Sequence, residues 1–261
     1  MSCIFLTLTS PNKHIDREDR TYLSSEGIIN LDNSGKLPIK EGFIRVITHN
    51  SKYIGLNSDR TVSLFLNFRE LRYYSPDEPS FINATEIDKD IIAIKSDGTV
   101  ISMLKGEMKK KDFIMFTRGL DNYDHIIGLK RSGTIEFLEP DINDNCLPKG
   151  SDYISIASGW LHIIALRSNG TICVKEFGVN DSWGLNSNTP RGNNFTAIAA
   201  YDGNSCALTN DGVIYVWGEG YKETKEFSAK DCVDIIISDR IIIGITSDEY
   251  QFICNLPMND F

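Results

Sequence analysis

The sequence predicts an all-β protein, a β-propeller of six blades, with seven blades as the alternative. Two observations predict this fold. The 261-residue chain repeats one apolar and polar pattern six times, at intervals of 35 to 42 residues, and no segment shows a helical period of apolar residues. Strand-only units of about 40 residues are typical of propellers. We predict a single propeller domain over residues 1–261, with clear repeats over 43–254 and an irregular or degenerate blade over 10–42.

Each repeat consists of an apolar strand, a tight turn and a second apolar strand. The six copies read IGLNSDRTVSLF from Ile54, IAIKSDGTVISM from Ile92, IGLKRSGTIEFL from Ile127, IALRSNGTICVK from Ile164, CALTNDGVIYVW from Cys206 and IGITSDEYQFIC from Ile243. Asp-Gly, Ser-Gly and Asn-Gly between such runs predict hairpin turns with positive φ. The first and last copies carry Arg60 and Glu249 where the others have Gly, so we expect a different turn there.

One more apolar run precedes each hairpin and raises the expected number of strands to at least three in each unit. These runs are Phe43–Ile47, Phe81–Ile87, Phe113–Phe116, Ile154–Ala157, Phe195–Ala199 and Cys232–Ile237.

A small residue stands five positions before every turn and is always followed by Leu or Ile. The six residues are Gly55, Ala93, Gly128, Ala165, Ala207 and Gly244. A strand that keeps Gly or Ala at one position indicates close approach of another backbone. We therefore expect these six to be structural residues of the repeat, on strands that crowd together near a common axis.

The two ends of the chain predict closure of the ring. The apolar segments Cys3–Thr9 and Tyr250–Cys254 are expected to be strands that complete a shared first and last blade, which would remove an exposed edge. Between them and the first clear repeat, Ile28–Asn30 followed by Asp32–Gly35 forms a weaker hairpin-like pattern.

Composition narrows the class of partner. The chain has 27 Lys and Arg against 36 Asp and Glu, a formal net charge of −9. Nucleic acids and anionic membranes attract basic surfaces, so we expect neither as a partner. No apolar stretch is long enough to span a bilayer. The six cysteines are scattered without a C-x-x-C pair, which is typical of reduced thiols in a cytosol-like compartment.

The fourth repeat carries the most specific motif. Its sequence from Ile154, ISIASGWLHIIALRSNG, combines Gly159, His162 and an Ala-Leu step, and FGVNDSWGL follows from Phe177. The fifth repeat contributes VIYVWG from Val213. These segments resemble the repeats of the regulator of chromosome condensation family. The resemblance covers residues 43–254 as architecture and is motif-specific over 154–218.

The resemblance implies roles for two histidines. In that family the residue equivalent to His162 is structural and bonds between neighbouring loops, and His125 stands in the same column one repeat earlier. The other four repeats have Lys52, Asp90, Asn204 and Ile241 in this column. No second His, Cys or carboxylate stands at metal-ligand spacing, so we expect no metal, no cofactor and no catalytic residue.

The candidate partner-binding residues are aromatic and charged. Trp160 and Trp183 fall in loops, where an exposed indole is favoured at a binding surface, with packing between blades as the alternative. The loop before Trp183 also holds Asn180 and Asp181. The basic run Lys109, Lys110 and Lys111 is a solvated turn or a partner-facing patch.

We therefore expect a protein-binding propeller and not an enzyme. Since the best-known members of the resembling family promote nucleotide exchange on the small GTPase Ran, the resemblance implies an exchange factor or regulator of a Ran-like small GTPase. The alternative is a non-catalytic adaptor, scaffold or inhibitor in a cytosolic complex. A propeller hydrolase or lyase is a third hypothesis, for which Asp90 and Asn204 are the polar residues near the expected channel.

The expected location follows from the expected partner. A regulator of a Ran-like GTPase works in the cytoplasm or the nucleus. Enrichment in Ile and Asn is typical of AT-rich genomes, so a pathogen effector acting in a host cytosol is one form of this hypothesis.

Overall fold

The chain packs as two compact units, residues 1–116 and 117–261. No α-helix, and no helix long and apolar enough to cross a membrane, occurs among the residues described. The computed structural model describes residues 21–24, 27–30, 43–49, 52–57, 62–66, 69–74, 81–87, 90–102, 105–108, 110–119, 125–139, 144–177, 181, 183–238, 241–246 and 250–255.

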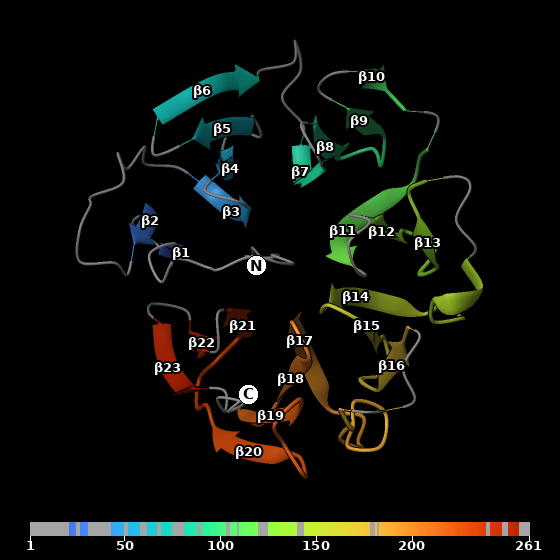
Figure 1. The fold of residues 1–261 in the computed structure, drawn as a ribbon, viewed down its shortest axis with the longest axis vertical. Coiled ribbons are helices and arrows are strands. Elements are labelled where there is room, and N and C mark those ends of the chain that lie inside the picture. Colours follow the sequence, from blue (N-terminus) through green and yellow to red (C-terminus); the bar gives the residue numbers. More distant parts are fainter. Residues whose placement is uncertain are drawn as a thin grey trace. The chain divides into compact units, whose positions relative to one another are not determined.

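The described part of the first unit forms one two-stranded and two four-stranded antiparallel sheets (Figure 1). The sheet orders are β1-β2, β3-β4-β5-β6 and β10-β9-β8-β7. The strands are β1 (Thr21–Ser24), β2 (Gly27–Asn30), β3 (Phe43–His49), β4 (Lys52–Asn57), β5 (Val62–Leu66), β6 (Arg69–Tyr74), β7 (Phe81–Ile87), β8 (Asp90–Lys95), β9 (Val100–Ser102) and β10 (Gly106–Glu107).

The later strands form four further antiparallel sheets, with orders β11-β12-β13, β14-β15-β16, β17-β18-β19-β20 and β21-β22-β23. A short 3-10 helix covers Asp144–Cys146. The strands are β11 (Phe113–Gly119), β12 (His125–Lys130), β13 (Ile135–Phe137), β14 (Tyr153–Ser158), β15 (His162–Arg167), β16 (Ile172–Glu176), β17 (Phe195–Tyr201), β18 (Asn204–Thr209), β19 (Val213–Gly218), β20 (Lys225–Ser228), β21 (Asp234–Ser238), β22 (Ile241–Ile245) and β23 (Tyr250–Asn255).

The predicted repeat is confirmed as a meander of three or four strands. Each apolar run before a hairpin is the first strand of a sheet, and the hairpin supplies the second and third strands. One detail differs from the prediction, because the first strand of the last sheet begins at Asp234 and not at Cys232. Ile28–Asn30 pairs with the strand before it, and the predicted turn Asp32–Gly35 lies outside the described residues. The predicted strand Cys3–Thr9 and the turns at Arg60 and Glu249 lie outside the described residues.

The turn glycines adopt the predicted left-handed conformation, with φ from +78° to +87° at Gly98, Gly133, Gly170 and Gly212. They also have a second function. The carbonyl oxygen of a turn glycine accepts a hydrogen bond from the backbone amide of the first residue of the next sheet. The distance from the amide nitrogen to the carbonyl oxygen is 3.2 Å both from Phe195 to Gly170 and from Tyr153 to Gly133. These bonds join successive sheets at one end of the strands.

The closeness of this contact excludes any side chain at the turn. A Cβ built on Gly170 would lie 2.2 Å from the carbonyl oxygen of Asn193, and one on Gly133 would lie 2.5 Å from that of Ser151. Both values are below any normal Cβ contact. Glycine is therefore required at these positions for two reasons, the positive φ of the turn and the closeness of the neighbouring backbone.

An aromatic residue begins five of the first strands, Phe43 of β3 among them, and this column was not recognised in the sequence. Phe81, Phe113, Tyr153 and Phe195 are all buried. The strand register shifts directly after the aromatic residue in four sheets, which marks a β-bulge at the same place in each, after Phe43, Phe81, Tyr153 and Phe195. The aromatic ring thus fills the base of each sheet where the turn glycine of the preceding sheet bonds to it.

The small-residue column lies in the second strand of each sheet and is packed on all sides. Ala93, Ala165 and Ala207 have 0% exposure. At Gly244 the crowding group is a side chain, because an added Cβ would lie 2.3 Å from Cys232 Sγ, and not a backbone as the sequence suggested.

The expected position of these strands needs a second correction. In the second unit β14 packs against β17, and β17 against β21 (Figure 1). The first strands, not the strands that carry the small residues, therefore lie beside one another from sheet to sheet.

The core lies between the faces of successive sheets. Trp217 is fully buried on β19, as its strand position predicted, and its indole Nε1 donates a 3.0 Å hydrogen bond to the carbonyl of Leu185. Ile164 and Leu166 of β15 pack in the same cluster. Burial of such large side chains is worth about 2 kcal/mol each and makes this the main stabilising contact between the two sheets.

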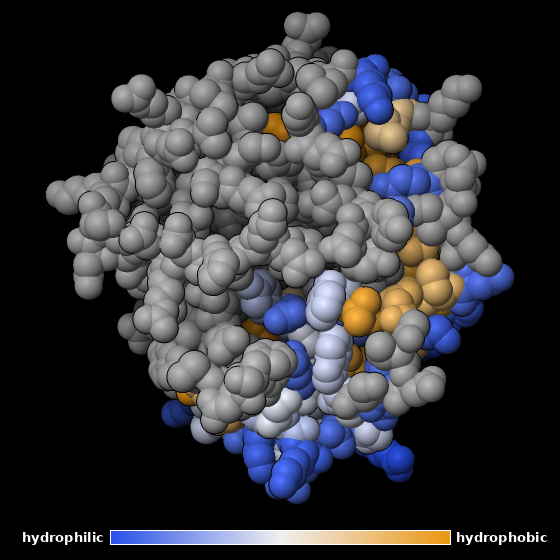
Figure 2. Space-filling view, viewed as in Figure 1, coloured by the Kyte–Doolittle hydropathy of each residue, from blue (hydrophilic) through white to orange (hydrophobic). Residues whose placement is uncertain are grey.

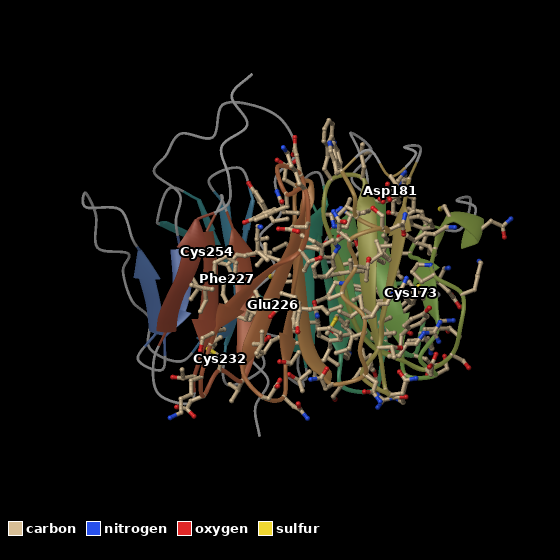
Figure 3. The ribbon with its side chains drawn as sticks, turned by 90° about the horizontal axis from the view of Figure 1, so that it is seen from below. Cys173, Asp181, Glu226, Phe227, Cys232 and Cys254 are labelled. Atoms are coloured by element: carbon tan, nitrogen blue, oxygen red, sulfur yellow. The ribbon has the colours of Figure 1, made fainter. Side chains whose placement is uncertain are left out.

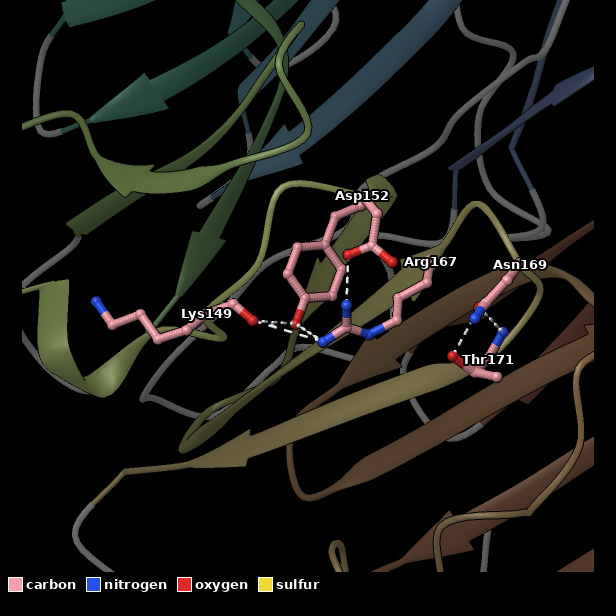
Figure 4. Close-up of polar contacts among 6 residues, drawn as sticks. Lys149, Asp152, Arg167, Asn169 and Thr171 are labelled. Atoms are coloured by element: carbon pink, nitrogen blue, oxygen red, sulfur yellow. Dashed lines mark hydrogen bonds and ion pairs between the residues drawn. The ribbon is translucent and has the colours of Figure 1, made fainter.

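A polar cluster fixes the chain where it enters β14 (Figure 4). Arg167 pairs with Asp152 and donates a 2.8 Å hydrogen bond to the hydroxyl of Tyr153, which in turn donates to the Lys149 carbonyl. Burial raises the pKa of Tyr153, so its phenol stays protonated and can act as this donor. The cluster keeps the Tyr153 ring in place beneath the turn glycine of the preceding sheet.

Replacing Gly170 by Ala is expected to destabilise the second unit more than the same change at Gly212. Both positions have φ near +80°, which costs about 1 to 2 kcal/mol for any L-residue. At Gly212 the added Cβ would meet Ala229 O at 3.1 Å, but at Gly170 it would meet Asn193 O at 2.2 Å and strain the bond to Phe195, adding about 1 kcal/mol or more. Urea midpoints at constant m-value measure the difference. Equal losses for the two variants would contradict the proposed sheet-to-sheet contact.

Candidate functional site

The two loop tryptophans of the second unit stack on each other. The rings of Trp160 and Trp183 have centroids 6.0 Å apart and an interplanar angle of 27°. Trp160 is 37% exposed, one of three large apolar side chains found exposed among the described residues, and Trp183 is half-buried. The two rings therefore pack together and still leave an apolar surface exposed, and a binding role for them stays a prediction.

Trp160 is held by a rigid backbone arrangement. The loop of residues 159–161 joins β14 to β15, and the Trp160 amide donates a 2.8 Å hydrogen bond to the carbonyl of Asp202. A Cβ on Gly159 would lie 2.2 Å from that carbonyl oxygen and 2.3 Å from His162 Cε1. Gly159 is therefore the residue that lets the loop between β17 and β18 approach the base of Trp160.

The Trp183 loop is folded around the Asp181 carboxylate. Asp181 has φ +51°, and its two oxygens accept hydrogen bonds from the amides of Asn186 at 2.9 Å and Ser187 at 3.0 Å. Burial raises the pKa of Asp181, but the hydrogen bonds from Ser187 and Asn186 outweigh it and lower the pKa overall. Asp181 is therefore negatively charged at neutral pH, directly beside Trp183.

A second carboxyl group supports the same loop from β16. Glu176 Oε1 accepts hydrogen bonds from the Asn186 amide at 3.1 Å and from its side chain at 2.9 Å. Burial and the neighbouring Asp181 carboxylate raise the pKa of Glu176. The other end of the loop is anchored in the core through Leu185, whose carbonyl accepts from Trp217.

Three further residues, Asp202, Gly203 and Glu219, complete the surface and come from the next sheet. A Cβ on Gly203 would lie 2.8 Å from Glu219 Oε2 and 3.3 Å from Trp183 Cε3, so the carboxylate and the indole lie no farther apart than the sum of these distances. Asp202 is exposed and has φ +51°. We call Trp160, Trp183, Asp202, Gly203 and Glu219 the tryptophan surface.

The tryptophan surface lies at one end of the strands. Figure 3 shows Asp181 at that end and Cys232 toward the opposite end. Hydrophilic residues gather at the outer edge that β20 forms (Figure 2), and three of the four β20 residues are exposed. Val233, next to Cys232, is an exposed apolar residue away from the tryptophan surface. A substitution of Val233 can therefore serve as a control for substitutions in the tryptophan surface.

Sequence reasoning found Trp160, Trp183 and Asp181 but missed Asp202, Glu219 and Glu176. The Asp202-Gly203 dipeptide is a tight-turn signal between two apolar strands and was visible in the sequence. Nothing in the sequence indicated that this turn would lie under Trp160 or that Glu219 would lie beside Trp183.

The remaining partner-binding candidates lie elsewhere or outside the described residues. Lys109 and Asn180 are outside them. Lys111 is exposed in the first unit and forms a 3.5 Å ion pair with Glu107, and Lys110 is half-buried. The basic run is thus partly neutralised within its own segment, and the structure gives no further sign of a patch there.

The two repeat histidines have different surroundings. His162 is fully buried, and its Nε2 lies 2.8 Å from Ser205 Oγ on the neighbouring sheet, a hydrogen bond that links β15 to β18. His125 is half-buried and packs edge-on against the Phe137 ring at 5.8 Å. Thr117 and Ser158 form a second buried link of this kind, 2.7 Å long.

The polar residues of the enzyme hypothesis are buried in strands. Asp90 accepts a 2.5 Å hydrogen bond from the Ser102 hydroxyl, and Asn204 is 8% exposed at the start of β18. Asp90 belongs to the first unit and Asn204 to the second. Within the described residues, no group of three His, Cys, Asp or Glu side chains could hold a metal ion.

Comparison with known proteins identifies the class to which this architecture belongs. Residues 195–222 match the model of the regulator of chromosome condensation (RCC1) repeat. They cover β17, β18, β19 and the start of the loop that follows β19. The resemblance seen in the sequence is thus confirmed for this segment. No curated protein matches the chain in sequence.

Solved structures extend the likeness to the fold. The chain is similar to Prp20p from Saccharomyces cerevisiae, with a TM-score of 0.52 and 13% identity over 84% of this chain and 69% of that one. It is similar to the ectodomain of the Physcomitrella patens receptor kinase CR4, with a TM-score of 0.60 and 16% identity over 81% of this chain and 61% of that one. It is also similar to BBS1N in its complex with ARL6DN, with a TM-score of 0.61 and 10% identity over 88% and 83%. The fold is that of an RCC1-like propeller.

Burial of His162 is expected to make the stability of the protein depend on pH. Burial lowers the pKa of His162 from 6.5 to about 3. Between these values the unfolded chain binds a proton that the folded chain does not, so stability is present above pH 6.5 and falls as the pH drops through that window. The loss between pH 7 and pH 5 is about 2 kcal/mol.

Urea unfolding at pH 5, 6 and 7 measures this contribution. His162→Gln should flatten the slope of unfolding free energy against pH, whatever its own stability. Ser205→Ala, which leaves the imidazole buried, should keep the slope. A His162→Gln protein with the full wild-type slope would show that other groups cause the dependence.

Proposed function

We propose that this chain is a non-enzymatic, protein-binding propeller whose binding surface includes the tryptophan surface. One observation carries the proposal: a stacked, partly exposed pair of indoles is held rigidly by hydrogen-bonded loops from two successive sheets. Trp is enriched at the energetic centre of protein interfaces, and a surface that needs no rearrangement loses little entropy on binding. The proposed ring has six blades and is closed by β23 with a strand from the N-terminal segment.

Similar propellers support a protein as the partner. Prp20p was described with its binding properties to Gsp1p and histones, Kap60 was crystallised bound to yeast RCC1, and BBS1N forms a complex with ARL6DN. A flat end of a propeller, built from loops on a rigid scaffold, suits such recognition. The charge of −9 disfavours a nucleic-acid partner for this chain.

The specific form of the proposal is an exchange factor or regulator of a Ran-like small GTPase. The RCC1 repeat at residues 195–222 supports it, because that segment carries Asp202, Gly203 and Glu219 of the tryptophan surface. Such a protein works by binding the nucleotide-free GTPase more tightly than the loaded one, which requires no catalytic side chain. This function would place the chain in the cytoplasm or nucleus where the GTPase works, including a host cytosol if the chain is a secreted effector.

Release of fluorescent GDP from Ran tests this form of the proposal. We expect the protein, at micromolar concentration, to accelerate release about tenfold or more, which corresponds to about 1.4 kcal/mol of barrier. Trp160→Ala should lose most of the acceleration, because it removes an exposed indole without opening the core. Val233→Ala, a truncation of a more exposed apolar side chain at the other end of the strands, should keep it.

Two results would contradict the proposal at different levels. Unchanged GDP release would exclude exchange activity on Ran and leave a non-catalytic adaptor, scaffold or inhibitor as the function. Acceleration that survives loss of both indoles in a folded Trp160→Ala, Trp183→Ala protein would show that another surface binds the GTPase.

A further inference from the structure

We propose that the tryptophan surface binds an arginine side chain within a basic segment of the partner protein. The inference rests on the proposed function, since it specifies the partner chemistry of the same surface. It follows from the positions of the indoles and carboxylates relative to one another.

The first part of the argument is the pairing of aromatic faces with carboxylates. The indole edge of Trp183 and the Glu219 carboxylate both lie close to Gly203, which has no side chain to keep them apart. Asp202, the preceding residue, accepts the Trp160 amide through its carbonyl and is exposed to solvent. The Glu219 carboxylate therefore lies close to the Trp183 indole, and the backbone of the exposed Asp202 is bonded to that of Trp160.

The second part is the local charge. The four loops that meet here, residues 159–161, 181–188, 202–203 and 219–224, contain four acidic residues and a single basic one, Lys222. Asp181 is fully ionised at neutral pH because its hydrogen bonds lower its pKa. An apolar partner would gain from the indoles alone, but a cation gains from both the indole faces and the surrounding carboxylates.

The third part is the choice of arginine. A guanidinium is planar, so it can stack on an indole while its edge donates to a carboxylate, whereas an ammonium makes only a point contact. It is also less strongly hydrated, which lowers the cost of placing it against an apolar ring. The stacked pair includes the 37% exposed Trp160 ring. The Glu219 carboxylate lies near the Trp183 ring, and Asp202 is an exposed acidic residue of the same surface.

Binding of a synthetic peptide tests the inference without any GTPase. The probe is a nine-residue peptide with three arginines separated by glycines, and its matched control carries citrulline, the neutral isostere, at the same three positions. Both are titrated against the full chain at low salt and followed by intrinsic tryptophan fluorescence. We expect saturable binding of the arginine peptide, about tenfold tighter than that of the citrulline peptide, and weaker at high salt.

Three variants locate the site. Trp160→Ala should weaken binding of the arginine peptide about tenfold. Asp202→Asn should weaken it about fivefold with little structural effect, because Asn tolerates the positive φ of this position. Val233→Ala should bind as the wild type does.

Equal binding of the two peptides, or arginine binding that survives both Trp160→Ala and Asp202→Asn, would overturn the inference. These outcomes are separate from those of the GDP assay. Peptide binding without GDP release would support the arginine site and contradict only exchange on Ran. GDP release without peptide binding would contradict the arginine site alone.

Discussion

The fold depends on the close contact between the turn glycine of one sheet and the chain that enters the next. At Gly170 and Gly133 a carbonyl accepts the amide of the first residue of the following sheet, and no Cβ would fit at either glycine. This contact fixes where the next first strand begins and buries its aromatic residue, Phe195 or Tyr153. Packing of the sheet faces around Trp217 then stabilises an arrangement whose register the turns have already set.

The tryptophan surface is built at the opposite end of the strands from these turns. There the close approach of backbone at Gly159 is combined with polar interactions of side chains. The Asp181 and Glu176 carboxylates hold the Trp183 loop, and the Asp202 carbonyl holds Trp160. Under the proposed function, the end that carries the tryptophan surface is the one that binds the partner. The buried link from His162 to Ser205 joins the same two sheets.

The sequence predicted local features well and distant contacts poorly. The turns at Gly98, Gly133, Gly170 and Gly212 were predictable because the requirement for positive φ is a property of the turn itself. The small-residue column was found because it repeats along the sequence. The reason for a small residue at Gly244 was not found, because the group that crowds it is the side chain of Cys232, which lies outside the strand.

The same limit applied to the candidate site. Trp160 and Trp183 were recognised as loop tryptophans, yet their stacking, the approach of Asp202 and the position of Glu219 join segments up to about 60 residues apart, with no local pattern that records them. His162 was predicted to be structural through its resemblance to the family, while its partner Ser205, 43 residues later, required the structure.

The most direct test of the central claim is to map where a basic partner segment makes contact. An arginine peptide that carries a benzophenone can be photo-crosslinked to the full chain, and the labelled residues identified by mass spectrometry. The account predicts crosslinks within residues 159–161, 181–188, 202–203 and 219–224, and competition by the unlabelled arginine peptide. Crosslinks concentrated around Lys149–Asp152 or Ala229–Val233, at the turn end of the strands, would contradict it.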